Sequence, residues 1–115
     1  MSEEFLLTGP INHFYLREPN GLLGVVAYQT RSDGFVGFAV STRNPRDNFD
    51  KQKGVDIALA RLRKGICKII PIETFIKNDI LRNIANDGGY SMRTRASAKT
   101  WLEFKASMEN ADVCP

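Results

Sequence analysis

The sequence has little of what histidine- or thiol-based chemistry requires. Its 115 residues contain one histidine, His13, and two cysteines, Cys67 and Cys114. Neither cysteine has a nearby cysteine or histidine at the spacing of a metal site, so we expect free thiols, no bound metal and no cofactor. A lone histidine in a strand-like segment is more often structural than catalytic. We therefore predict no catalytic residues and a protein that is not an enzyme.

Long apolar runs and phosphate-loop motifs are also missing. No segment approaches the roughly 20 apolar residues that span a bilayer, and residues 1–4 are acidic where a secretory signal is basic. Neither GxxxxGK[ST] nor GxGxxG occurs, which excludes a P-loop nucleotide hydrolase. We expect a cytoplasmic protein with no membrane partner, folded as a single globular domain over residues 1–115.

Strand patterns fill the first part of the chain. Residues 13–17 alternate between apolar and polar, and two runs rich in valine and aromatic residues follow at 22–30 and 35–42. The Asp33-Gly34 pair between these two runs predicts a hairpin. A short apolar run at 66–70 predicts a fourth strand.

Helix patterns dominate the rest. An apolar stripe with i, i+3, i+4, i+7 spacing predicts an amphipathic helix that ends at Gly65; it consists of Val55, Ala58, Leu59 and Leu62. Pro71 predicts the start of a second helix that ends at residues 87–89. Ser97 is the predicted N-cap of a last helix, whose core face carries Trp101, Phe104 and Met108.

These elements together predict an α+β fold. Its simplest form is an antiparallel meander of three or four strands, followed by two or three helices packed on one face of the sheet. Such a sheet leaves an edge uncovered, and we expect a homo-oligomer for that reason.

Positive charge is concentrated in one stretch. The whole chain carries a net charge of +3, but residues 43–68 hold eight basic and three acidic side chains, a local surplus of five. The basic residues are Arg43, Arg46, Lys51, Lys53, Arg61, Arg63, Lys64 and Lys68.

Several of these cations gather where the first helix is expected to begin. Free N–H groups at a helix N-terminus favour anions, and arginine forks match phosphate oxygens. We predict an anion site that consists of Ser41, Arg43, Asn44, Arg46, Phe49, Lys51 and Lys53. A solvated basic face is the alternative interpretation. The nearby Asp47, Asp50 and Asp56 could in principle hold Mg²⁺, but helix capping is the favoured interpretation.

A polar stretch before the last helix is the second candidate. In this predicted loop, Tyr90 could stack on a base while Arg93 and Arg95 close over a phosphate. An ordinary polar connector is the alternative interpretation.

One stretch of the sequence resembles small accessory proteins of tailed bacteriophages. The resemblance covers residues 37–62 and consists of Gly37-Phe38-Ala39-Val40-Ser41, Asn44-Pro45, Asp47, Phe49, Lys51, Gly54, Ile57-Ala58 and Arg61-Leu62. Proteins of that kind act in host takeover or anti-defence within the host cytoplasm. Some sequester nucleotide immune signals as oligomers, whereas others bind nucleic acid or host polymerases.

The resemblance and the charge pattern together favour one function. We predict a non-enzymatic protein that binds an anionic small molecule, a phosphorylated nucleotide, and that sequesters a nucleotide immune signal. The alternative is a protein that binds nucleic acid, or a host protein such as a polymerase, through the basic surface of residues 43–68.

Overall fold

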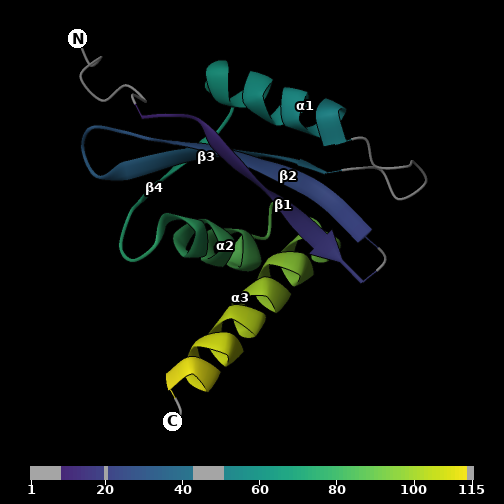
Figure 1. Ribbon diagram of the computed structural model, residues 1–115. Helices are drawn as coiled ribbons and strands as arrows, with labels where there is room; N and C mark the ends of the chain where they lie inside the picture. The colour runs from purple at the N-terminus through teal and green to yellow at the C-terminus, as the bar shows by residue number, and fades with distance from the viewer. Residues whose placement is uncertain (1–8, 20, 43–50, 114–115) are drawn as a thin grey trace.

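In the part of the chain that the structure describes, four antiparallel strands form one sheet in the order β1-β2-β3-β4, and three helices cover it (Figure 1). The computed structural model describes residues 9–19, 21–42 and 51–113, with side chains as far as residue 104. The elements are β1 (Asn12–Glu18), β2 (Gly21–Thr30), β3 (Phe35–Thr42), α1 (Lys51–Arg63), β4 (Lys68–Pro71), α2 (Ile76–Asn86) and α3 (Met92–Val113). The α+β fold class and the four-stranded antiparallel sheet are confirmed.

The hairpin between β2 and β3 forms where Asp33-Gly34 predicts it. Gly34 has a φ of 86°, a backbone conformation that residues with a side chain rarely adopt. The Arg31 guanidinium donates two hydrogen bonds to the Asp33 carboxylate, at 3.2 and 2.7 Å, across the turn. The local sequence alone therefore accounts for this turn.

Both faces of the sheet are apolar. Phe14, Val26 and Phe38 belong to the cluster that packs against α2 and α3. Val25 and Ala39 belong to a second cluster, which packs against α1. Because successive side chains of a strand point to opposite faces, one strand such as β2 contributes to both clusters.

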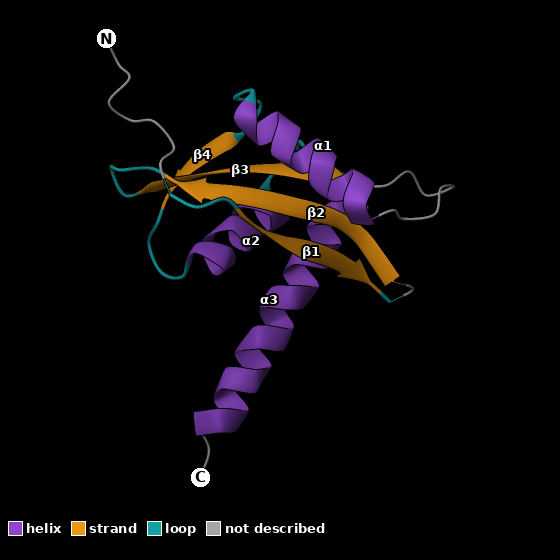
Figure 2. Ribbon diagram, turned by 45° about the horizontal axis from the view of Figure 1, so that its top comes forward, coloured by secondary structure: helices purple, strands orange, loops and turns teal. Residues whose placement is uncertain are grey.

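The helices accordingly lie on both faces, which corrects the prediction that they pack on one. Figures 1 and 2 show α1 on one side of the sheet and α2 with α3 on the other. Residues 23–27 of β2 are all buried, as is typical of a strand covered on both sides. In addition, α1 lies between β3 and β4 in the chain, so not all strands precede the helices.

The first helix ends as the sequence predicts. Gly65 follows α1 with a φ of 80°, and its N–H donates to the Leu62 carbonyl at 3.2 Å. The N–H of Ile66 donates to the Arg61 carbonyl at 2.8 Å, which completes a glycine C-cap.

Two other helix starts differ from prediction. Pro71 does not open a helix; it ends β4, where it pairs with Phe35, and α2 begins later, at Ile76. The last helix begins at Met92 instead of near Ser97, because the Ser91 hydroxyl accepts a hydrogen bond from the Thr94 N–H at 3.2 Å. None of the helices in the described part of the chain has the length and apolar character needed to cross a bilayer.

Asp79 organises the segment that leads into α2. Its buried carboxylate accepts hydrogen bonds from the Glu73 N–H (2.8 Å), the Thr74 N–H (3.0 Å) and the Thr74 hydroxyl (2.7 Å), and it pairs with Arg82. Burial by itself would raise the pKa of Asp79, but these hydrogen bonds, together with Arg82, outweigh it and lower that pKa. The ionised carboxylate is therefore part of the folded structure.

We expect Asp79→Asn to lower the free energy of unfolding by about 2 kcal/mol at neutral pH, the scale of hydrogen bonds to a charged group. A lowered pKa stabilises the fold above the unfolded-state pKa of about 4, and that stabilisation is lost as pH falls through the folded-state pKa. Urea denaturation across pH should therefore show the wild-type and variant stabilities converging in acid. Asp56→Asn, at an exposed carboxylate of α1, is the matched control. A constant gap between wild type and Asp79→Asn at every pH would contradict this role.

Candidate binding pocket between β1, α2 and α3

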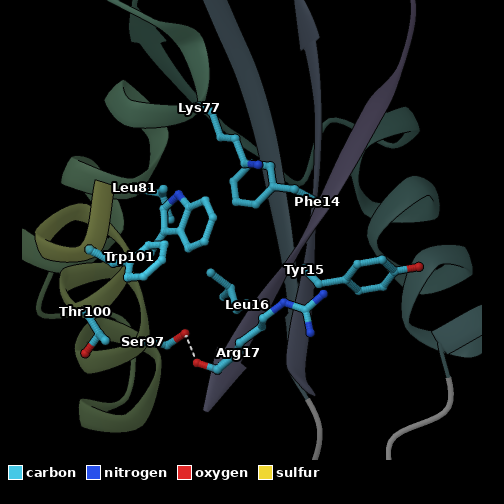
Figure 3. Close-up of a pocket in the computed structure, with 10 residues that line it drawn as sticks. Phe14, Tyr15, Leu16, Arg17, Lys77, Leu81, Ser97, Thr100 and Trp101 are labelled. Atoms are coloured by element: carbon cyan, nitrogen blue, oxygen red, sulfur yellow. Dashed lines mark hydrogen bonds between the residues drawn. The ribbon is translucent and has the colours of Figure 1, made fainter. Parts of the chain in front are cut away.

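A pocket of about 440 Å³ lies where the edge strand β1 meets the layer of α2 and α3 (Figure 3). This volume falls within the range of small-molecule sites. Its lining residues are Phe14, Tyr15, Leu16, Arg17, Lys77, Leu81, Ser97, Thr100, Trp101 and Phe104.

Aromatic and aliphatic side chains form the walls. Phe14 and Leu16 alternate along β1 and face the helices, and α3 contributes Trp101 and Phe104 one helical turn apart. These two rings stack with centroids 5.9 Å apart and planes at 28°. Phe104 is 54% exposed, so the apolar wall continues to the protein surface.

Lys77 places its positive charge beside the rings of Phe14 and Trp101. Its ammonium nitrogen lies 5.1 Å from the centroid of Phe14 and 5.2 Å from that of Trp101. Arg17 lines the pocket with its backbone, whereas Figure 3 shows its guanidinium turned toward Tyr15; the described residues that line the pocket include no carboxylate. The pocket therefore combines ring faces with positive charge.

Hydroxyl groups lie on the α3 side. The Ser97 hydroxyl donates to the Arg17 carbonyl at 2.7 Å and thereby fixes α3 against β1. Thr100 lies one turn further along α3 and also lines the pocket. Figure 3 shows the Tyr15 ring on the opposite side of β1, pointing away from Trp101.

The Trp101 indole N–H is buried and has no hydrogen-bond partner among the described residues. Leaving a buried donor unpaired costs about 1–3 kcal/mol. Packing against Phe104 and Lys77, not a hydrogen bond, therefore holds the indole in place.

A second hollow of about 510 Å³ lies between β4 and α2. Its lining is more polar, and three of its charged side chains form ion pairs: Asp79 with Arg82, and Asp87 with Lys68. We interpret these pairs as structural supports of α2: the Asp79–Arg82 pair lies within the helix, and the Lys68–Asp87 pair connects its C-terminal end to β4.

The predicted anion site at the start of α1 is described only in part. Four of its residues lie outside the described residues: Arg43, Asn44, Arg46 and Phe49. Ser41 is buried near the end of β3, whereas Lys51 and Lys53 are exposed in the first turn of α1. The Lys51 ammonium lies 5.6 Å from the centroid of the Tyr15 ring.

The predicted loop of residues 90–95 is mostly the first turn of α3, which corrects that expectation. Tyr90 is half-buried below the Lys68 ammonium (5.0 Å to the ring centroid), and burial raises the pKa of its hydroxyl. Arg93 makes a two-pronged ion pair with Glu18, one of whose hydrogen bonds measures 2.8 Å. The Nε atom of Arg95 is buried and lacks a hydrogen-bond partner among the described residues.

The sheet separates these two candidate sites. Lys51 lies beside Tyr15, which packs with the cluster on the α1 side. Tyr90 packs with the cluster on the opposite side. A ligand held by Lys51 therefore cannot at the same time stack on Tyr90.

Sequence reasoning assigned the pocket residues other roles. Phe14 and Leu16 read as one side of a half-buried strand, and Trp101 with Phe104 as the core face of a helix. The available signal was the spacing of Trp101 and Phe104, which lie three positions apart and therefore on one face of the helix. The sequence gives no signal for Lys77, because its role in the pocket comes from contact with Phe14 and Trp101, which are distant from it in the chain.

Comparison of the chain with protein-family models, with curated proteins and with solved structures finds no match. The resemblance to phage accessory proteins therefore stays a prediction. Within the described residues, no three His, Cys, Asp or Glu side chains gather as metal ligands. The pocket must be interpreted from its own chemistry.

We expect Trp101→Phe to leave the free energy of unfolding within about 1 kcal/mol of wild type, because the lost N–H makes no hydrogen bond to any described residue. Trp101→Ala should cost roughly 2–3 kcal/mol, below the range for a fully buried tryptophan, since this side chain is only partly buried. Urea denaturation of both variants measures the difference. Equal losses would show that the indole N–H has a stabilising partner.

Proposed function

We propose that the protein binds, without catalysis, a small anionic ligand with a planar aromatic body, and that this ligand is a phosphorylated nucleotide. The site is the pocket between β1, α2 and α3. One observation carries the proposal: aromatic walls and the Lys77 ammonium line the pocket, and the described lining residues include no carboxylate. An anion with an aromatic ring matches both properties.

The pocket offers aromatic ring faces on which the ring of the ligand can stack. Aromatic side chains stack on nucleobases, and each stacked base contributes about 1–3 kcal/mol. Trp101 and Phe14 present ring faces that the Lys77 ammonium now covers. Because Lys77 has a long flexible stem, its ammonium can shift toward a phosphate and leave a ring face to the base.

The pocket also supplies a positive charge for the anionic group of the ligand. An ammonium that binds phosphate is a compact charge with three donors, and such charge-assisted bonds are stronger than neutral ones. Lys77 supplies this charge at the rings, and the Thr100 hydroxyl adds a potential hydrogen bond from α3.

The lining supports binding in preference to catalysis. Its described residues include no carboxylate, imidazole or thiol, the groups that most often act as general acids, bases and nucleophiles. The Ser97 hydroxyl is engaged with the Arg17 carbonyl. Sequestration of a nucleotide signal by a phage-encoded homo-oligomer would use the same chemistry, and those further features stay predictions.

We expect at least one member of a panel of mono-, di- and cyclic nucleotides to bind in isothermal titration calorimetry, and the matching nucleoside, which lacks phosphate, to bind more weakly. Lys77→Met should weaken the nucleotide about tenfold, since loss of a charged hydrogen bond costs about 1.5 kcal/mol or more. Lys99→Met, at an exposed lysine of α3 outside the pocket lining, is the control with the same change of charge.

Two results would overturn the proposal. The first is that no nucleotide in the panel binds. The second is that Lys77→Met and Lys99→Met weaken binding equally, which would place the ligand away from Lys77.

A further inference from the structure

The exposed side of α1 is strongly basic. Its buried residues, Gly54, Ala58 and Leu62, form the stripe that faces the sheet. Five basic side chains are exposed along the helix and directly after it: Lys51, Lys53, Arg61, Arg63 and Lys64. Of these, Arg61 donates one hydrogen bond to the Val40 carbonyl at 2.6 Å and keeps its other donors for a ligand. Asp56 is the one acidic residue of α1, and it accepts a hydrogen bond from Gln52 at 2.9 Å.

These charges lie at both ends of the helix. With a rise of 1.5 Å per residue, Lys51 and Arg63 are about 18 Å apart along the axis. A single phosphate cannot contact both ends. An extended polyanion can, and it would follow the length of α1.

An aromatic pair lies at the N-terminal end of this basic track. α1 packs over β2 and β3, and the Tyr15 ring of β1 lies on the same face of the sheet. Lys51 places its ammonium 5.6 Å from that ring, and the exposed His13 ring meets Tyr15 edge-on at 5.6 Å. Cations that follow a backbone beside rings that stack on bases are typical of single-strand binding sites.

We infer that this surface, the α1–β1 face, binds single-stranded nucleic acid; it consists of Tyr15, Lys51, Lys53, Arg61, Arg63 and Lys64. The phosphate backbone lies along α1, and an unpaired base stacks at Tyr15. A duplex hides the faces of its bases, so it can use the cations but not the ring. This face lies across the sheet from the pocket, and the inference does not depend on the nucleotide proposal.

Fluorescence anisotropy with a labelled oligothymidylate tests the inference. We expect binding that weakens with salt, because each neutralised phosphate releases counterions. Lys64→Gln removes one contact and should lower the slope of log K against log salt by about 0.7. Lys99→Gln on α3 changes the net charge equally and should leave the slope unchanged.

Stacking is tested separately. Tyr15→Leu keeps an apolar side chain at this partly buried position but removes the ring, so single-strand affinity should fall about tenfold with little change in salt slope. Urea denaturation checks that Tyr15→Leu remains folded, and His13→Ala, on the exposed neighbour, gives a second variant. Both variants should leave duplex binding unaffected.

Three outcomes would overturn the inference. They are no binding of the oligonucleotide at low salt, equal effects of Lys64→Gln and Lys99→Gln, and single-strand affinity that neither Tyr15→Leu nor His13→Ala lowers. In the last case, the surface would bind polyanions in general and not single strands. Lys77→Met should not alter oligonucleotide binding, which separates this surface from the nucleotide pocket.

Discussion

The structure depends on burial of β2 from both sides. Val25 and Val26 are adjacent in the chain, yet both are fully buried, one under α1 and the other under α2 and α3. Apolar burial stabilises at about 25 cal/mol per Å² and has no direction, so both faces require cover. Three layers follow from this constraint: α1, the sheet, and α2 with α3 (Figure 2).

The two helical layers meet the sheet differently. On the α1 side the partners are small, with Ala27 and Ala39 opposite Ala58, and the cluster has no large aromatic residue that is fully buried. On the other side large side chains, among them Phe14 and Phe38, fill the space. The pocket forms at the edge of this second layer, because helices that cross an edge strand do not fill the corner between them.

The chemistry of the molecule is divided by the sheet. On one side, Lys77 and the rings of Phe14 and Trp101 form a pocket whose cation-covered ring faces are suited to a small ligand. On the other, the charges of α1 are exposed and spread along a helix, which suits an extended partner. Two arginine pairs have a different role: Arg31 with Asp33 spans the β2–β3 turn, and Arg93 with Glu18 connects α3 to β1.

The sequence by itself determined the features that depend on neighbouring residues. These include the Asp33-Gly34 hairpin, the apolar stripe of α1 with its stop at Gly65, and the α+β class. Only the tertiary structure decided which face each helix covers and that Phe14, Lys77 and Trp101 share a pocket. The physical reason is distance along the chain: periodicity shows that a side chain is buried, but its partner is chosen by the packing of segments far apart in sequence.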